Sequence, residues 1–277
     1  MKKIIVPVDF SLHSENALRT AASLAKQFKS EIVAVHMLEL SNALISVSSS
    51  YINEQAVYQI KLAKQKFEEF LDKRYLSDVT VSTLIQPYKD FSSFHDLKGQ
   101  EDADLIIMSS QGTSGFKEMF LGSNSEVVVR NSTIPVLVIK GLPISEPFKK
   151  AVFACDFSKV FVESYKQAKE LLDAFKCEIE LVNVNTPGAK FKTTKEKKER
   201  IDSFLYSVGA DFDNKPTIVE VSDYKIEDGI LEYAQLNGSD LIIMPTHGKI
   251  GIEHFLDGSI AEDVVNHATL PVLTLKI

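Results

Sequence analysis

The chain of 277 residues has no tryptophan, only two cysteines and no apolar run of the roughly 18 residues that a membrane span needs. Cys155 and Cys177 show neither a CxxC pattern nor metal-ligand spacing, so we expect them to be buried, reduced side chains. The first residues, "MKKIIVPVDFS", are interrupted by Asp9 and lack a small-residue cleavage site, which disfavours a signal peptide. These features favour a cytoplasmic protein without a membrane partner.

A surplus of positive charge is also missing, since the formal net charge is −7. Binding to nucleic acid through phosphates needs a basic surface, so no nucleic-acid partner is predicted. The one basic run, "KFKTTKEKKER" at 190–200, is interpreted as a solvated helix face.

Several catalytic patterns are absent from the sequence. It contains no GxxxxGK[ST] motif, so no P-loop lysine reaches a terminal phosphate. Neither a Ser–His–Asp order nor a His–Glu metal spacing persists in both halves, and the counterpart of His247 is Gln111. We therefore predict no metal site, no catalytic residue and no enzyme activity, with a slow ATPase or phosphotransferase as the competing interpretation.

Internal duplication determines the expected organisation. "KKIIVPVDFS" at 2–11 returns as "KKAVFACDFS" at 149–158, and nine of sixteen positions in 122–137 are identical to those in 258–273. Two prolines and a glycine interrupt the chain between the copies. We predict repeat one at 1–141, repeat two at 148–277 and a linker at about 142–147.

Apolar runs alternate with amphipathic helical patterns in both repeats. The predicted strands are 3–8, 31–38, 79–85, 104–108 and 135–140, then 151–155, 178–184, 217–221, 240–244 and 271–277. In repeat one the predicted helices are 13–28, 53–75, 91–100 and 125–131. Strands rich in Val, Ile and Leu that alternate with helices predict an α/β fold with two doubly wound, Rossmann-like parallel sheets.

Two loops in each repeat are candidate ligand-binding segments, because ligands bind at the carboxyl ends of parallel strands. The first loop follows strand one and contains Asp9 or Asp156. The second follows strand four, where a glycine, nine further residues and Gly-Ser precede a helix: Gly112, Gly122 and Ser123 in repeat one, and Gly248, Gly258 and Ser259 in repeat two. Glycines beside a helix N-terminus permit close approach of a phosphate.

A purely structural alternative fits the same residues. Ser123 stands three residues before Glu126 and Ser259 three before Glu262, which are capping-box patterns. The two aspartates could likewise cap helices or pair locally. Two loops that converge on one sheet edge in both repeats favour binding, and a capped helix still offers backbone amides.

With these motifs the chain resembles the universal stress protein family, whose mark is G-x2-G-x9-G-[ST] after strand four and an Asp after strand one. The resemblance covers nearly the whole chain and implies five-stranded parallel sheets of order 3-2-1-4-5 that pair through their last strands as a pseudo-dimer. It implies ATP or AMP as the ligand, with Mg²⁺ as an accompanying ion, and a non-enzymatic role in the stress response. A residue after strand two also contacts adenosine in such proteins, and by position it is Met37 or Val184 here.

The chain departs from that pattern at the first glycine of the motif, which is Ser109 in repeat one and Pro245 in repeat two. Because proline has no N–H, we expect repeat one to bind nucleotide better, with Ser109 in its site. Repeat one also carries 11 extra residues, placed near 40–52, where five serines suggest a flap over the ligand or against a second molecule, or a plain surface insertion. A further homodimer is left open, and so is a protein-interaction domain whose degenerate sites no longer bind nucleotide.

Overall fold

The structure is a computed structural model that describes residues 1–38, 49–87, 102–110, 123–188, 191–210, 214–246 and 258–277. Repeat one contains β1 (Lys3–Pro7), α1 (Leu12–Phe28), β2 (Glu31–Leu38), α2 (Ser49–Leu71), a 3-10 helix (Arg74–Leu76), β3 (Val81–Pro87), β4 (Leu105–Ser109), α3 (Ser123–Asn131) and β5 (Val136–Ile139). Repeat two contains β6 (Lys150–Ala154), α4 (Phe161–Asp173), β7 (Glu178–Asn185), α5 (Thr194–Val208), β8 (Thr217–Ser222), α6 (Ile226–Leu236), β9 (Leu241–Thr246), α7 (Gly258–His267) and β10 (Val272–Lys276). The predicted helix at 91–100 lies outside the described residues.

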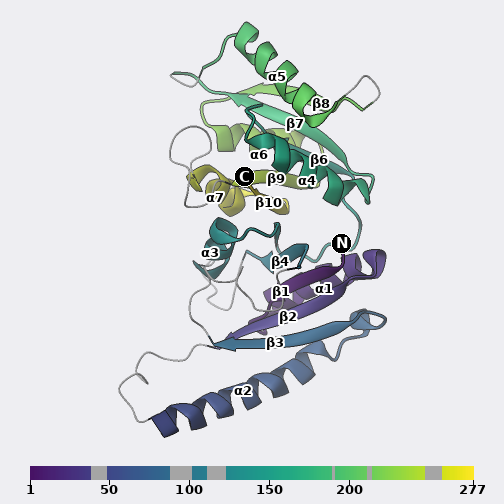
Figure 1. Cartoon of the computed structure of the whole chain (residues 1–277), viewed down its shortest axis with the longest axis vertical. Helices are drawn as coiled ribbons and strands as arrows, with labels where there is room; N and C mark the ends of the chain where they lie inside the picture. Colours follow the sequence, from purple (N-terminus) through teal and green to yellow (C-terminus); the bar gives the residue numbers. More distant parts are fainter. Residues whose placement is uncertain (39–48, 88–101, 111–122, 189–190, 211–213, 247–257) are drawn as a thin grey trace.

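All ten strands form one sheet, in the order β3-β2-β1-β4-β5-β10-β9-β6-β7-β8 (Figure 1). Neighbouring strands within each repeat are parallel, and β5 pairs with β10 antiparallel, with Leu137 opposite Leu273. The predicted 3-2-1-4-5 order and the pairing through the last strands are therefore confirmed. The two repeats meet as a pseudo-dimer within one chain.

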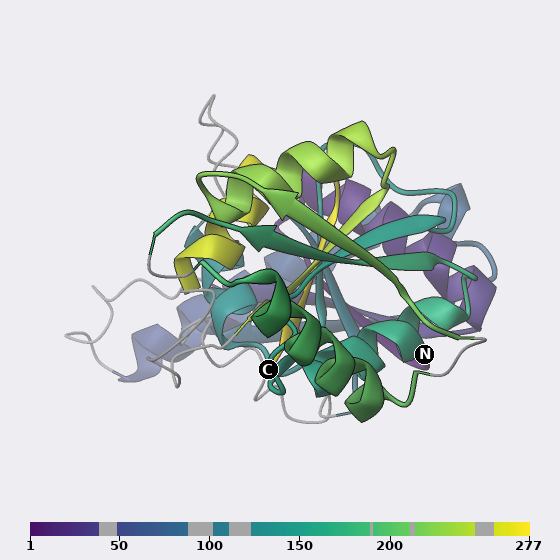
Figure 2. The same cartoon turned by 90° about the horizontal axis from the view of Figure 1, so that it is seen from above.

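Helices cover both faces of this sheet (Figure 2). In repeat two, α4 packs against α5 and α6 packs against α7, so each pair covers one face. Two covered faces explain why the central strands are continuously apolar: all five residues of β4 and all six of β9 are buried. In contrast, the edge strand β8 has only half-buried and exposed residues.

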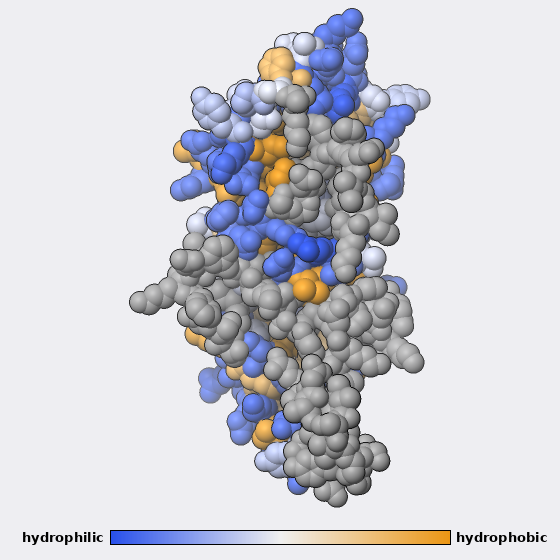
Figure 3. Space-filling model, turned by 90° about the vertical axis from the view of Figure 1, so that its left-hand side faces the viewer, coloured by the Kyte–Doolittle hydropathy of each residue, from blue (hydrophilic) through white to orange (hydrophobic). Residues whose placement is uncertain are grey.

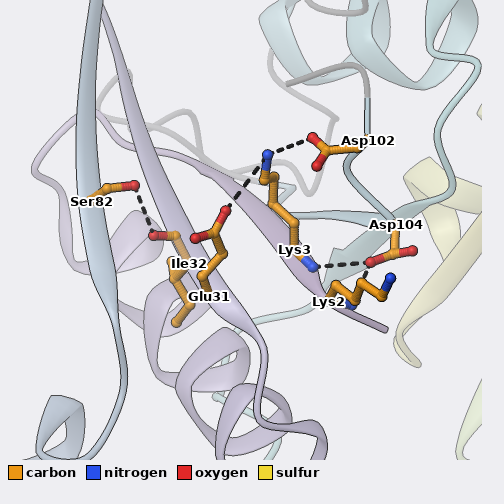
Figure 4. A network of polar contacts seen from close by, with 7 residues as sticks. All are labelled: Lys2, Lys3, Glu31, Ile32, Ser82, Asp102 and Asp104. Carbon is orange, nitrogen blue, oxygen red and sulfur yellow. Dashed lines mark hydrogen bonds and ion pairs between the residues drawn. The ribbon is translucent and has the colours of Figure 1, made fainter. Parts of the chain in front are cut away.

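One aspartate before the fourth strand of each repeat stabilises the amino-terminal edge of the sheet. Asp104 accepts hydrogen bonds from the backbone N–H groups of Lys2 and Lys3, the latter at 2.9 Å (Figure 4). Asp240 accepts equivalent bonds from Lys149 at 2.9 Å and Lys150 at 3.2 Å. These carboxylates lie at the edge of the sheet opposite the predicted binding edge. They satisfy backbone N–H groups at the start of the first strand in each repeat.

A reciprocal pair of lysines joins the two repeats. The Lys140 amine, just after β5, donates to the Val265 carbonyl in the last turn of α7. The Lys276 amine, at the end of β10, donates to the Arg130 carbonyl in the last turn of α3 at 3.2 Å. A cation at a helix C-terminus satisfies carbonyls without intrahelical partners and interacts favourably with the helix dipole. Each repeat therefore caps the last helix of the other.

Strand ends differ from the predicted boundaries by at most two residues, and the largest difference is at the ends of α2. α2 begins at Ser49, so residues 49–52 of the predicted serine-rich flap belong to a helix, and the rest of that insertion falls in the undescribed segment 39–48. Helix starts are weakly specified by sequence when the first turn consists of serines, which are neutral to unfavourable inside a helix.

Candidate ligand site at the carboxyl ends of the strands

The loop after the first strand has the same backbone conformation in both repeats. Phe10 and Phe157, which directly follow the two aspartates, adopt left-handed φ angles of 64° and 62°. The preceding carboxylate accepts a backbone N–H two residues on: Asp9 from Ser11 at 3.0 Å, and Asp156 from Ser158 at 2.8 Å. The predicted local pairing of both aspartates is thus observed, and it orients each carboxylate at the end of its strand.

Aromatic packing holds these left-handed residues in place. The Phe10 ring lies 4.6 Å from that of His36 and 5.1 Å from that of Phe67, between ring centroids. The Phe157 ring lies 5.7 Å from that of Phe204 in α5. A left-handed conformation costs a residue with a side chain roughly 1–2 kcal/mol, which burial of a phenyl ring offsets.

A side chain from the second strand bridges to the first strand in each repeat. His36 Nδ1 lies 2.8 Å from the Val8 carbonyl oxygen, and Asn183 Nδ2 donates to the Cys155 carbonyl at 2.9 Å. These equivalent contacts tie the carboxyl ends of two neighbouring strands together, next to the aspartates. Sequence reasoning missed both residues because they are of different types in the two repeats.

The adenosine-contacting positions implied by the family lie inside strands rather than after them. Met37 is the seventh residue of β2 and is half-buried against the core. Val184 is the seventh residue of β7 and is also half-buried. The predicted strands 31–38 and 178–184 already contained both residues. The bounds of β2 are confirmed, and β7 is one residue longer than predicted because its pairing with β8 continues to Asn185.

In repeat two, Asp156 and Val184 line one shallow pocket that opens to solvent. Its remaining walls are apolar except for the Asn183 amide and the Cys155 thiol: Ala154, Val182, Ile226 and Ile230. The wall formed by α6 lies close to the strand because Gly229 has no side chain. A Cβ at this position would lie 2.8 Å from Val184 Cγ1. Sequence reasoning missed this glycine as well.

The two aspartates differ in exposure and in their distant partners. Asp9 is exposed, and its Oδ1 also accepts the Ser11 hydroxyl at 2.6 Å. Asp156 is buried, and its Oδ2 lies 3.3 Å from Nη1 of Arg200 in α5. The prediction that the basic run 190–200 is only a solvated helix face is therefore wrong at Arg200. The helical pattern alone could not reveal a partner 44 residues away.

The segment after the fourth strand is described only at its two ends. Gly112, Gly122 and Gly248 lie outside the described residues, whereas Ser123 begins α3 and Gly258 and Ser259 begin α7. Ser109 is buried at the end of β4, where its carbonyl accepts the Ser125 hydroxyl of α3 at 3.2 Å. The first turn of α3 therefore lies against the carboxyl end of β4, as the predicted arrangement requires.

At the first-glycine position of repeat two, Pro245 lies inside β9. Its strand pairs with β6 only as far as Ile243, so proline occupies a position beyond the last paired residue on that side. It remains paired in register with Leu275 of β10. Proline has no backbone N–H to donate to a neighbouring strand. It is tolerated here, as at edge strands, because no such donor is needed at this position.

The acidic residues of the two capping-box patterns meet at the junction of the repeats. α3 and α7 lie side by side, and Arg130 Nη2 lies 2.6 Å from Glu262 and 3.3 Å from Glu126. Figure 3 views the side of the molecule nearest these two helices, where described hydrophobic side chains reach the surface among hydrophilic ones. The carboxylates of Glu126 and Glu262 link the two repeats through the guanidinium of Arg130.

Neither cysteine has the environment of a reactive thiol. Both are free and buried. Burial raises the pKa of Cys177 to about 12, and burial also raises the pKa of Cys155, so both thiols stay protonated near neutral pH.

Within the described residues, no group of three or more His, Cys, Asp or Glu side chains is placed to hold a metal ion. Among the described helices, none combines the length and apolar character of a membrane span.

Comparison with known proteins agrees with this arrangement. The model of the universal stress protein family matches residues 1–140 and again residues 147–276. A universal stress protein of Synechocystis sp. is 25% identical over 299 residues. The match covers 100% of that protein and 100% of this chain. One from Methanocaldococcus jannaschii is 28% identical over 146 residues, which cover 50% of this chain and 82% of the relative.

A solved structure supports the fold across both repeats. The universal stress protein from Archaeoglobus fulgidus DSM 4304 matches with a TM-score of 0.65 at 22% identity, covering 99% of this chain and 96% of that one. Together with the two matches to the family model, this likeness accounts for the order of strands and the antiparallel junction. The chain belongs to the universal stress protein family, as a tandem member with two repeats.

Proposed function

We propose that the protein binds an adenine nucleotide, ATP or AMP, at the carboxyl ends of the strands and acts in the cytoplasm as a non-enzymatic regulatory module of a stress response. One observation carries this proposal. Asp156 and Val184, the two residues that the family resemblance assigns to adenosine, are 28 positions apart in sequence and line the same pocket.

The chemistry of the pocket suits a nucleoside. A carboxylate is only an acceptor, so Asp156 can receive a hydrogen bond from a ribose hydroxyl or an exocyclic amine. Val184, Ile226 and Ile230 offer apolar surface to a flat base. Asp9 and Met37 supply the same two functions in repeat one.

Phosphate groups would lie toward the first turns of α3 and α7. α3 begins at Ser123 and α7 at Gly258, within the motif, where the first backbone N–H groups and the helix dipole favour an anion. Mg²⁺ would accompany ATP by binding its phosphate oxygens, which are hard ligands for this ion.

The groups that line the repeat-two pocket favour binding over catalysis. Its ionisable members are Asp156, which pairs with Arg200, and Cys155, whose pKa burial raises. The Asp156 carboxylate is already engaged by the Ser158 N–H and the Arg200 guanidinium, and a protonated thiol is not a nucleophile. A slow ATPase remains the competing function for the experiment to test.

Calorimetric titration with ATP, AMP and adenosine, each with and without Mg²⁺, tests the proposal directly. We expect saturable binding of ATP and AMP. A phosphate-release assay on the same sample should give turnover far below roughly 1 s⁻¹, the lower end of the ordinary enzyme range. Faster turnover that is lost in Gly122→Val and Gly258→Val would contradict the non-enzymatic role, and absence of binding would contradict the proposal itself.

A further inference from the structure

Arg200 occupies a specific place in repeat two rather than lying along a solvated helix. It belongs to the second turn of α5, the helix that follows the carboxyl end of β7. From there its guanidinium reaches the carboxylate of Asp156 at the end of β6, with Nη1 3.3 Å from Oδ2. The contact crosses from the helical layer to the strand end that forms the candidate site.

Three independent contacts hold α5 in this position. Thr193 and Glu196 form a complete capping box at its N-terminus. Lys197, three residues before Arg200, pairs with Glu220 on β8 at 3.3 Å. Phe204, four residues after Arg200, is buried, and its ring packs on that of Phe157. Because the helix is anchored on both sides of Arg200, the approach of its guanidinium to Asp156 follows from the fold.

The two oxygens of the Asp156 carboxylate have different neighbours. Oδ1 accepts the Ser158 backbone N–H at 2.8 Å, a contact internal to the loop. Oδ2 is therefore the oxygen that a ligand would approach, and it lies against Arg200. The side chain of Asp156 is only 5% exposed. A hydroxyl or amine donor of a ligand and the guanidinium compete for the same acceptor.

We propose that Arg200 is an affinity-determining residue of repeat two: its ion pair with Asp156 must open before a nucleoside can bind there. This inference rests on the proposed function and adds to it a cause for unequal repeats. It concerns the nucleoside end of the ligand, and is independent of the loss of a backbone N–H at Pro245 near the phosphate end.

The ion pair is weak enough to open. The side chain of Arg200 is 41% exposed, so water can replace part of its interaction with Asp156. A ligand that binds only the open form has an apparent affinity equal to its intrinsic affinity multiplied by the fraction of molecules that are open. Removal of the guanidinium should therefore strengthen binding to repeat two by about three- to tenfold.

The test uses ATP titration of the full chain carrying Gly122→Val, which is designed to leave only repeat two able to bind. Arg200→Gln is added to this background, and circular dichroism checks that each variant is folded. We expect the ATP dissociation constant to fall about three- to tenfold. The matched control is Lys195→Gln, which removes the same charge from the same helix but from an exposed pair with Glu199, and it should leave the constant within about twofold.

A second measurement avoids dependence on the Gly122 substitution. Arg200→Gln alone is titrated in the otherwise unchanged chain, where only the weaker of two binding phases should tighten. Equal affinities with and without Arg200, or equal gains in Arg200→Gln and Lys195→Gln, would overturn the inference while leaving nucleotide binding intact. Weaker binding in Arg200→Gln would make Arg200 a ligand contact and overturn it too. If no chain binds ATP, the proposed function fails and the inference falls with it.

Discussion

Repeat one exposes the aspartate of its candidate site, whereas repeat two buries the equivalent aspartate and pairs it with an arginine. The backbone around both residues is nevertheless the same. Each aspartate precedes a phenylalanine in the left-handed region, and each lies beside a carbonyl bridged from the second strand. Duplication has preserved the geometry of the loop while the chemistry around its carboxylate has diverged.

The junction between the repeats shows the opposite behaviour. There the equivalent residues Leu137 and Leu273 face each other across β5 and β10, and the equivalent lysines Lys140 and Lys276 cap opposite helices. These residues have kept matching roles because Leu137 packs against its own counterpart and each lysine caps the last helix of the opposite repeat. The binding edge is free of that constraint, so differences accumulate there.

The largest expected effect tests the equivalence of the junction. Leu137→Ala and Leu273→Ala each remove a side chain that is at most 2% exposed from the centre of the sheet. Each should lower the free energy of unfolding by about 2–5 kcal/mol, and by similar amounts. Urea denaturation with a constant m-value measures both. A difference above about 2 kcal/mol between them would break the pseudo-symmetry.

A substitution specific to repeat two comes next. Gly229→Ala places a methyl group against the β-branched side chain of Val184, so we expect a loss of about 1–3 kcal/mol of stability. It should also weaken the nucleotide-binding phase of repeat two while leaving that of repeat one unchanged. Leu236→Ala, in the same helix at an 80% exposed position, is the control and should change stability by less than about 0.5 kcal/mol. Unchanged stability in Gly229→Ala would show that α6 does not need its close approach.

The two capping lysines should differ in their pH dependence. Burial lowers the pKa of Lys140 from 10.5 to about 8. The unfolded chain then binds more protons than the folded one between about pH 8 and 10.5, so stability due to this group rises as pH increases through that window. Below pH 8 the buried charge opposes folding. Relative to Lys140→Met, the unchanged chain should gain roughly 1–3 kcal/mol across the window.

Lys276 provides the comparison for that titration. Burial also lowers its pKa, but its side chain is less enclosed than that of Lys140. Lys276→Met should therefore alter the pH dependence of unfolding less than Lys140→Met does. Thermal unfolding at pH 7.5, 9 and 10.5 separates the two variants. A larger effect at Lys276 would contradict the burial argument.

The smallest effect concerns the strand-bridging side chains. His36→Asn places in repeat one the residue that repeat two uses at the same position. Because an amide can also donate to the Val8 carbonyl, we expect a loss below about 1 kcal/mol, whereas His36→Ala leaves that carbonyl without this donor and should cost about 1–3 kcal/mol. Equal losses in both variants would mean that ring packing on Phe10, rather than the hydrogen bond, is what His36 contributes.

Local patterns were sufficient to predict the architecture of the fold. Continuous apolar strands and amphipathic helices in duplicate predicted the α/β fold, and the resemblance implied the order of the strands. The family resemblance implied that Asp156 and Val184 lie together, and the pocket that both line agrees with the rule that parallel strands end at the same edge. Contacts that depend on the path of a distant helix were not predictable, and Arg200 looked like any other charge on a solvated face.

Other contacts were missed because the residue type suggests something else. A glycine inside a helix, such as Gly229, suggests a weak point rather than a close approach to a strand. Glu126 and Glu262 fit capping boxes, yet their carboxylates contact Arg130. Such contacts require knowledge of which helices become neighbours, and here that depends on the antiparallel pairing of β5 with β10.

The central claim is that both repeats bind adenine nucleotide and that repeat one binds it more tightly. Paired ATP titrations of Gly122→Val and Gly258→Val, each after circular dichroism has confirmed the fold, test it most directly. We predict that the change in repeat one removes the tighter phase and that the change in repeat two removes only the weaker one. Loss of most binding in Gly258→Val, with little change in Gly122→Val, would contradict this account.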